Sequence, residues 1–482
     1  MARARSRETL GVGLLTAVAL ALRLLVTRSI WIDEAISIRQ ARLPFGELLE
    51  NLRTFDVHPP LHHIVLWVST RWIGDSEFAV RLPSMLVGTA LVPLMYLAGA
   101  RLWDRRTGAV AAVLITFAPL AVWYSQEARM YSLFLGLATL ALLAQAIVLR
   151  QSRRRAWTTY TAATVGLLWT QYFGILPVAV QQIAFAVDVT RRRRRGEHVG
   201  HILRAWALSS LTIVLAVLPL AGLFTQQFAE VGGGGGGVPS QAGLTSVGAE
   251  DAPDIYALLA NVIWAVWGYH SDATMAQIVA LWPLGILAVI LLLGRGRSPQ
   301  GILLTGLAAV PMMLLFAAGS YRRNLFELRY FIGIVPMLLL LTSRAIASWL
   351  STRAGVVLAT AAVVVTLGVG LVDQQLNGTN PRLYDFRGAF ALVEANAAPG
   401  DLVVYEPEYM ADVFRYYSPQ LRAQPLAQGP ETRGADRVFL VGSFLDIPVV
   451  AGRVGGALAR LEEERRLVER LEVPNVTIWV FE

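Results

Sequence analysis

A small set of polar side chains in this otherwise apolar sequence could carry chemistry. Asp33 and Glu34 form an acidic pair directly after the first apolar segment, and His58 precedes two prolines and a leucine. Glu127 and Arg129 lie in a third polar segment, after another apolar run. A carboxylate in such a position can act as a general base that removes a proton from an attacking hydroxyl. It can equally provide oxygen ligands for a divalent cation.

The acidic pair also has a structural interpretation, because carboxylates in the first turn of a helix stabilise its N-terminus. The sequence alone leaves both interpretations open for Asp33 and Glu34. Neighbouring side chains on a helix do not face the same direction. We therefore expect the two carboxylates to have different roles.

Three of the six histidines lie close together in the sequence, at His58, His62 and His63. The spacing of His58 and His62 would suit a metal, but the two prolines between them interrupt a helix. We therefore interpret His62 and His63 as residues on the polar face of a surface helix. His58 is the better functional candidate, because the Pro-Pro pair fixes the backbone where the helix begins.

Several arginines could bind an anionic group, since a guanidinium holds a phosphate through paired donors. These candidates are Arg129, Arg322, Arg323 and Arg329, with Tyr131 and Tyr330 close by in the sequence. Lipid headgroups, or a salt bridge within an aromatic belt at the membrane surface, would also account for these side chains.

The composition indicates a membrane protein. Of the 482 residues, 55% are hydrophobic and 16% are charged, with a mean hydropathy of +0.52, whereas a soluble domain has about 25% charged residues. The absence of cysteine excludes disulfides and thiol nucleophiles. A net charge of +8 could suggest a nucleic-acid partner, but the arginines cluster in short segments between apolar runs, where they act as topology signals.

Apolar runs of about 15–20 residues recur up to about residue 370, which predicts about eleven membrane spans. The predicted spans are residues 10–26, 83–102, 108–122, 132–148, 157–170, 175–189, 205–224, 275–293, 302–317, 331–341 and 356–371. With the N-terminus inside, nearly every arginine cluster falls inside, except the one around residues 322–329. An outer arginine cluster breaks the pattern, so we expect it to have a function. The three polar segments share this outer side, and we interpret them as one active site.

The segments between the spans differ in character. Residues 28–82 form the first outer loop, in which 45–52 and 61–72 are predicted to be short amphipathic helices in the membrane interface. Residues 225–274 form a long outer loop, and its run of six glycines predicts a hinge or a lid.

The composition changes after residue 372. Residues 401–405, 437–441 and 476–481 are predicted strands, and residues 385–397 and 458–471 are predicted helices. About 110 residues suffice for a small domain. We therefore predict a transmembrane catalytic domain over residues 1–372 and an extracytoplasmic α/β domain over residues 373–482.

Taken together, these motifs resemble those of the bacterial protein O-mannosyltransferase-like glycosyltransferases. The resemblance rests on Asp33-Glu34, His58-Pro59-Pro60-Leu61, residues 74–84, residues 124–131 and Glu327-Leu328-Arg329-Tyr330-Phe331. It covers roughly residues 25–350. Members of this group have the GT-C fold, which they share with the aminoarabinose transferase of lipid A and the catalytic subunit of oligosaccharyltransferase.

The resemblance implies a polyprenyl-phosphate-linked sugar donor and transfer outside the cytoplasm. It implies that Asp33 is the catalytic base and that Glu34 and His58 line the acceptor and donor pocket. The segment with Glu127 and Arg129 matches a loop that helps to hold a metal in oligosaccharyltransferase, although here it has a single acid. The aminoarabinose transferase has a lysine where this chain has His58.

We therefore predict an inverting membrane glycosyltransferase in which Asp33 and Glu34 are catalytic and Asp33 is the general base. The residues predicted to bind the donor phosphate and lipid are Arg129, Arg329, Tyr330, Arg322 and Arg323. The residues predicted to line the pocket are His58, Glu127, Tyr131 and Arg81. A divalent metal such as Mg²⁺ or Mn²⁺, if bound, would contact Asp33, Glu127 and His58.

The expected acceptor is a hydroxyl of a lipid, a glycan or a protein, and no nucleic-acid partner is expected. The expected location is a bacterial inner or plasma membrane, with a cytoplasmic N-terminus. The main alternative is a transporter or flippase of a lipid-linked sugar, which would carry ionisable residues near the middle of the membrane. A second alternative is a receptor whose outer domain binds a ligand.

Overall fold

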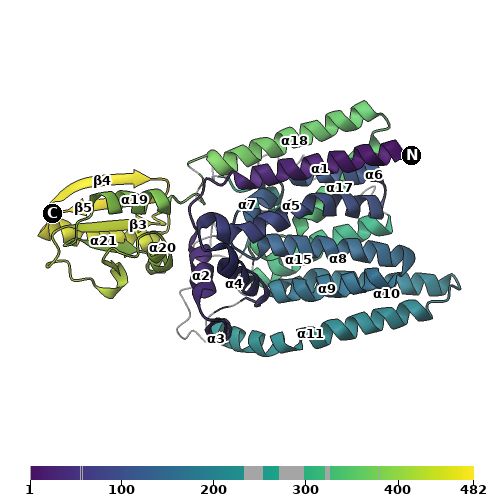
Figure 1. The fold of residues 1–482 in the computed structure, drawn as a ribbon, viewed down its shortest axis with the longest axis horizontal. Helices are drawn as coiled ribbons and strands as arrows, with labels where there is room; N and C mark the ends of the chain where they lie inside the picture. The colour runs from purple at the N-terminus through teal and green to yellow at the C-terminus, as the bar shows by residue number, and fades with distance from the viewer. Residues whose placement is uncertain are drawn as a thin grey trace.

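The computed structural model describes residues 2–54, 56, 58–232, 253–270, 298–320, 326–378, 380 and 382–482. These residues form a bundle of helices with a small α/β domain at one end (Figure 1). The N-terminus lies at the opposite end of the bundle, and the C-terminus lies in the α/β domain. The predicted fold class is confirmed.

A helix overlaps each predicted span that falls within the described residues. The helices of the bundle are α1 (Ala2–Leu24), α5 (Glu77–Leu102), α6 (Arg105–Phe117), α7 (Pro119–Ser125), α8 (Tyr131–Gln151), α9 (Arg154–Thr170), η1 (Tyr172–Gly174), α10 (Ile175–Arg194), α11 (Gly200–Gly232), α12 (Ile255–Trp267), α15 (Pro299–Gly319), α16 (Leu328–Phe331), α17 (Ile334–Trp349) and α18 (Arg353–Leu376). The predicted span over residues 275–293 and most of the glycine run lie outside the described residues.

Six helices in the described part of the chain are long and apolar enough to cross a membrane, and a seventh span results if the bent pair α6–α7 is counted as one. That pair bends by 58° at Ala118, where Pro119 begins a new helix. The prediction of about eleven spans included shorter or more charged helices. α9 has 17 residues and α17 has 16, and α1 carries Arg7, Glu8 and Arg23 within its last 18 residues.

Close backbone packing joins α5 to α6. A Cβ atom on Gly99 would lie 2.8 Å from Cα of Gly108, and a Cβ on Gly108 would lie 2.4 Å from the carbonyl oxygen of Tyr96. Small residues at such a crossing allow two helices in a membrane to approach without intervening side chains. The end of α5 and the first turn of α6 are therefore in direct backbone contact.

Three short helices lie at the end of the bundle that carries the α/β domain (Figure 1). They are α2 (Ile32–Arg42), α3 (Phe45–Thr54) and α4 (Leu61–Ile73). The two amphipathic helices predicted from the sequence are α3 and α4. α2 begins with the acidic pair in its first turn, which agrees with the structural interpretation of Asp33 and Glu34. The bounds of α2 were not predicted, because its apolar residues do not form a clear stripe.

The α/β domain contains one five-stranded sheet in the order β2-β1-β3-β5-β4. Its elements are α19 (Phe386–Asn396), β1 (Leu402–Glu406), η4 (Glu408–Met410), α20 (Ala411–Tyr417), β2 (Ala423–Pro425), η5 (Leu426–Gln428), β3 (Val438–Ser443), α21 (Pro448–Glu464), β4 (Leu467–Val473) and β5 (Val476–Phe481). β1 pairs in parallel with β2 and β3, whereas β5 is antiparallel to β3 and β4. In this register Phe439 lies opposite both Val403 and Val480, in the centre of the sheet.

One prediction for this domain was wrong. The helix predicted over residues 458–471 ends at Glu464, and residues 467–473 form β4. β4 is an edge strand with mostly exposed side chains, so its charged residues are solvated and do not reveal the strand period. A tight turn with Asn475 at φ 56° connects it to β5.

The α/β domain packs on the residues that lead into α2. Ser29 donates a hydrogen bond to the carbonyl oxygen of Tyr384 (2.5 Å), and the backbone N–H of Ile30 donates to the hydroxyl of Tyr417 (2.7 Å). The ring of Trp31 lies against Tyr384, with the ring centroids 5.2 Å apart. The domain therefore contacts the chain directly before the acidic pair.

The helix crossing gives a stability prediction. Gly108→Ala forces a methyl group against the backbone of α5 and should destabilise the protein by about 1–3 kcal/mol. Gly368→Ala in α18 is the matched control, because no atom lies within 4 Å of the new Cβ. Thermal unfolding in detergent, followed by size-exclusion chromatography, measures both. Equal midpoints for the two variants would contradict the proposed packing.

Candidate active site

Asp33 and Glu34 lie in the first turn of α2, and both side chains are buried. As expected for neighbours on a helix, they face different partners. Glu34 points toward α5, whereas Asp33 points toward arginines from two distant segments. Their environments therefore assign them different roles.

Each carboxylate oxygen of Glu34 accepts two hydrogen bonds. Arg81 donates from Nε to Oε1 (2.8 Å) and from Nη2 to Oε2 (2.7 Å), and the backbone N–H groups of Ala128 (2.8 Å) and Trp31 (3.0 Å) donate to the same two oxygens. Burial alone would raise the pKa of Glu34, but the charge and hydrogen bonds of Arg81, with those backbone donors, leave the pKa below its ordinary value. Glu34 thus joins α2 to α5 and to the loop after α7.

Arg81 is equally committed to this contact. Besides the pair with Glu34, it donates to the carbonyl oxygens of Arg28 (3.0 Å) and Ser29 (2.9 Å), and its side chain is 1% exposed. Arg81 therefore holds residues 28–34 in place. This position gives no support to the predicted role of Arg81 in lining a substrate pocket, or to direct catalysis by Glu34.

Asp33 faces two guanidinium groups. Its Oδ2 lies 3.4 Å from Nη1 of Arg329 and 3.9 Å from Nη2 of Arg129. Arg129 also donates to the hydroxyl of Ser37, one turn further along α2 (2.9 Å), and Nε of Arg329 lies 2.5 Å from Oε2 of Glu327. One carboxylate and two arginines, from segments 296 and 96 residues away from Asp33, thus form a compact polar site.

Glu127 belongs to a neighbouring contact. Its Oε1 lies 3.2 Å from Nη1 of Arg28, whose guanidinium covers the ring of Trp123 at 3.5 Å from the centroid. Burial raises the pKa of Glu127, and the nearby charge of Glu34 adds to this, although Arg28 acts in the opposite sense. Glu127 is therefore held by Arg28 beside the polar site.

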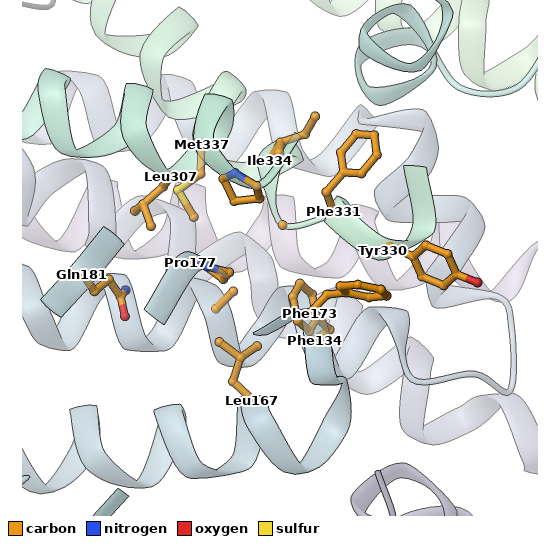
Figure 2. A pocket seen from close by; sticks show the side chains of 13 residues that line it. Phe134, Leu167, Phe173, Pro177, Gln181, Leu307, Tyr330, Phe331, Ile334 and Met337 are labelled. Carbon is orange, nitrogen blue, oxygen red and sulfur yellow. The ribbon is translucent and has the colours of Figure 1, made fainter. Parts of the chain in front are cut away.

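An apolar pocket begins next to Arg329. It lies among α8, α9, α10, α15 and the segment from Tyr330 to Met337, and its lining is mainly apolar. Figure 2 shows Tyr330 and Gln181 at opposite ends of the lining side chains. The Arg329 guanidinium lies 5.4 Å from the centroid of the Tyr330 ring, so one end of the pocket adjoins the polar site. Tyr131 is buried nearby and packs on Tyr124, with ring centroids 4.5 Å apart.

The histidines differ from their prediction. His62 and His63 do not lie on an exposed polar face, because their exposed fractions are 4% and 2%. The ring Nε2 of His62 lies 3.1 Å from the carbonyl oxygen of Ala128, and burial lowers the pKa of His63 to about 4. His58 contacts Asp56, with Nδ1 2.9 Å from Oδ1. The first turn of α4 is therefore buried against the loop that carries Arg129.

The predicted metal ligands are not brought together as a set. Among the residues that the structure describes, His58 belongs to a group with metal-ligand spacing, and its companions are Asp56 and His63 instead of Asp33 and Glu127. Arg322 and Arg323 lie outside the described residues.

Several residues of the site were missed in the sequence. Arg28 is the clearest, because it follows the first span on the predicted outer side and so breaks the positive-inside pattern as the 322–329 cluster does. Ser37 is one helical turn from Asp33, so a predicted helix that extended to residue 37 would have placed the two side chains together. Glu327 lies two residues before Arg329 and was quoted in the family motif, but it was not predicted as a site residue.

Comparisons with known proteins identify the fold. Residues 57–220 match the family model described as dolichyl-phosphate-mannose-protein mannosyltransferase. The structure of ArnT from Cupriavidus metallidurans bound to undecaprenyl phosphate is similar over 97% of both chains, with 14% identity and a TM-score of 0.57. The chain has the GT-C glycosyltransferase fold. None of the curated proteins matches it significantly.

A second solved structure agrees with this GT-C assignment. The oligosaccharyltransferase AglB from Archaeoglobus fulgidus, in complex with an inhibitory peptide and a dolichol-phosphate, matches 98% of this chain and 74% of its own, with 11% identity and a TM-score of 0.53. The predicted resemblance and the prediction of a glycosyltransferase are confirmed. The family match includes Arg81, Glu127 and Arg129, whereas Asp33 and Arg329 lie outside its bounds.

The buried ion pair gives a second stability prediction. Glu34→Gln leaves the Arg81 cation buried without a carboxylate, which should cost about 3–5 kcal/mol of unfolding free energy. Because the folded pKa of Glu34 is depressed, this stabilisation is present above the ordinary glutamate pKa of about 4.3 and is lost as the pH falls through the folded value.

Glu8→Gln is the control, since Glu8 pairs with Arg105 at the surface and should contribute less than about 1 kcal/mol. Unfolding in denaturant at pH 7 and at pH 4 compares the two variants with the wild type. A Glu34→Gln protein as stable as Glu8→Gln at pH 7 would show that the buried pair does not hold α2.

Proposed function

We propose that this protein transfers a sugar from a polyprenyl-phosphate-linked donor to an acceptor hydroxyl, with Asp33 as the general base. The observation that carries the proposal is the position of Asp33 between Arg129 and Arg329, where the apolar pocket ends. A donor of this class combines an anionic phosphate with a long apolar chain. The site offers guanidinium groups to bind the phosphate and an apolar pocket to bind the chain.

The lipid part of the donor would occupy the apolar pocket. The pocket is lined mainly by aromatic and aliphatic side chains (Figure 2). One of them, Tyr330, contacts the Arg329 guanidinium through its ring. A phosphate at the Tyr330 end would lie within reach of Arg329, which is placed by Glu327 and Asp33. The solved ArnT structure with undecaprenyl phosphate and the AglB structure with dolichol-phosphate support a lipid phosphate as the ligand class.

In the proposed reaction Asp33 removes the proton from the acceptor hydroxyl. The acceptor oxygen forms a bond to the anomeric carbon as the bond from that carbon to the phosphate oxygen breaks. The polyprenyl phosphate leaves with the bonding electron pair, and Arg129 and Arg329 stabilise its developing charge, which is worth about 3–4 kcal/mol for a well-placed donor. One displacement inverts the anomeric configuration, so a product that keeps the donor configuration would exclude this mechanism.

The proposed orientation places the polar site outside the cytoplasm. The N-terminus and the α/β domain lie at opposite ends of the bundle, and the polar site lies at the domain end (Figure 1). The C-terminal ends of α8, with Arg150, and of α10, with four arginines, would then be cytoplasmic, in accord with the positive-inside rule. We propose a bacterial plasma membrane as the location and a lipid, glycan or protein hydroxyl as the acceptor.

Loss of the proposed base should abolish transfer. Asp33→Asn keeps the side-chain shape but cannot accept the proton, so the transfer rate should fall by about 10²–10⁴-fold. The assay offers a panel of labelled polyprenyl-phosphate sugars to membrane extracts and follows transfer with and without a chelator.

Asp75→Asn is the control for this assay, because Asp75 forms an exposed pair with Arg42 and should leave the rate unchanged. Transfer that survives in Asp33→Asn would remove Asp33 as the base. If the wild type moves lipid-linked sugar across vesicles without transferring it, the flippase alternative replaces the proposal.

The role of the pocket can be tested with donors of different chain length. Ala138 lines the pocket, and Ala138→Phe would fill part of it, so KM should rise about tenfold for long polyprenyl donors. Donors with one or two isoprene units should be affected little. Ala361→Phe on the exposed face of α18 is the matched control. An equal loss with short and long donors would contradict binding of the chain in this pocket.

A further inference from the structure

A group of three potential metal ligands lies at the start of α4, and the proposed reaction does not use it. Asp56 and His58 come from the segment before α4, and His63 comes from its first turn. The three ligand atoms all lie within 4.8 Å of one another. Oδ1 of Asp56 is 2.9 Å from Nδ1 of His58, and Oδ2 of Asp56 is 3.6 Å from Nε2 of His63.

These distances suit a small tetrahedral ion. With metal–ligand bonds of about 2.0–2.1 Å, ligand atoms at the corners of a tetrahedron are about 3.3 Å apart. The two measured separations, which run to different oxygens of Asp56, lie on either side of this value. The three ligand atoms lie within 4.8 Å of one another, so an ion could enter if the side chains drew together, in place of the present contact between Asp56 and His58.

The surroundings of His63 point to a missing ligand. Its side chain is 2% exposed, and its Nδ1 has no hydrogen-bond partner among the described residues. Its Nε2 is too far from Asp56 for a good hydrogen bond. A buried imidazole with a weak partner is less stable than one whose nitrogen is closely bound. A metal at Nε2 would give that nitrogen the close partner that Asp56 does not provide, and Nδ1 would keep its present surroundings.

The Asp56 carboxylate is held by a hydrogen bond from a neighbouring side chain, as the carboxylate ligands of metals usually are. The side-chain amide of Gln40 donates to Oδ2 of Asp56 (2.8 Å) and to Oδ1 of Asn51 (3.1 Å). Such outer contacts fix a ligand before the metal binds. His58 is the most exposed of the three, with 21% of its side chain accessible, so a fourth position would open on its side.

We propose that Asp56, His58 and His63 bind one divalent transition-metal ion, with zinc as the best match. Two imidazole nitrogens and one carboxylate suit zinc better than magnesium, which prefers oxygen ligands. Three protein ligands with an open fourth position are typical of zinc sites that bind a further molecule. This assignment differs from the Mg²⁺ or Mn²⁺ site predicted from the sequence in both its metal and two of its ligands.

The site lies beside the proposed phosphate site. His62, next to His63 in α4, contacts the carbonyl oxygen of Ala128, and Arg129 follows Ala128 in the same loop. If the proposed function holds, the open position of the metal would offer a phosphate oxygen a third positive partner on that side. Metal binding itself does not depend on the proposed function.

The first test measures bound metal without any transfer assay. Purified full-length protein is loaded with one equivalent of Zn²⁺, dialysed and examined by inductively coupled plasma mass spectrometry. We expect about one zinc per wild-type chain and at least a tenfold weaker affinity for Asp56→Asn and His63→Gln. His201→Gln in α11 is the matched control, because His201 is exposed and far from these residues in the sequence, and it should keep the metal.

Cobalt keeps the proposal testable if a variant fails to fold. Wild-type protein loaded with Co²⁺ should give the absorption of a tetrahedral site, with imidazole nitrogens visible in X-ray absorption spectra. A wild type that binds neither ion, or the same zinc content in Asp56→Asn, His63→Gln and wild type, would overturn the proposal. Zinc bound as expected with no sugar transfer would instead contradict the proposed function alone.

Discussion

The structure depends on the buried ion pair between Glu34 and Arg81. Neither side chain reaches water to a significant extent, and their mutual contacts and backbone hydrogen bonds occupy both carboxylate oxygens. A buried charge without its partner is costly, so the two side chains must stay together. Through this contact the start of α2, the first turns of α5 and the loop after α7 have one fixed arrangement.

Asp33 gains its position from this arrangement. Asp33 is adjacent to Glu34 in α2. The ion pair that fixes Glu34 therefore also fixes the direction in which the Asp33 side chain points from the helix. The same loop provides both the Ala128 N–H for Glu34 and the Arg129 guanidinium near Asp33. A single structural contact therefore sets the geometry of the neighbouring polar site, which is a common requirement for preorganised catalysis.

Much of this organisation could be predicted from the sequence. Apolar runs revealed the helices of the bundle, because the bilayer sets their length, and strands β1, β3 and β5 were visible as short apolar segments. The outer arginine cluster led to Arg329 because an exception to the positive-inside rule needs an explanation. These signals are local or statistical, so one sequence is enough to read them.

The pairing of residues could not be predicted in the same way. Nothing in the sequence shows that Glu34 meets Arg81 while Asp33 meets Arg329, because both acids and all candidate cations look alike until the chain is folded. Asp56 and His63 were missed as partners of His58 for the same reason. The extent of α2 was not predicted because the helix is buried on several sides and has no apolar stripe.

The contact between the α/β domain and residues 29–31 has a thermodynamic consequence. Ser29 and Ile30 form hydrogen bonds with the domain, and the carbonyl oxygen of Ser29 accepts one from Arg81, so the domain and the ion pair both hold this short segment. A ligand that binds the domain and stabilises this contact would reduce the conformational freedom of the Asp33 side chain. By linkage, a molecule that orders Asp33 would bind more tightly to a chain in which the contact is already stabilised. The soluble domain thus has a route to influence the membrane site without touching its substrate.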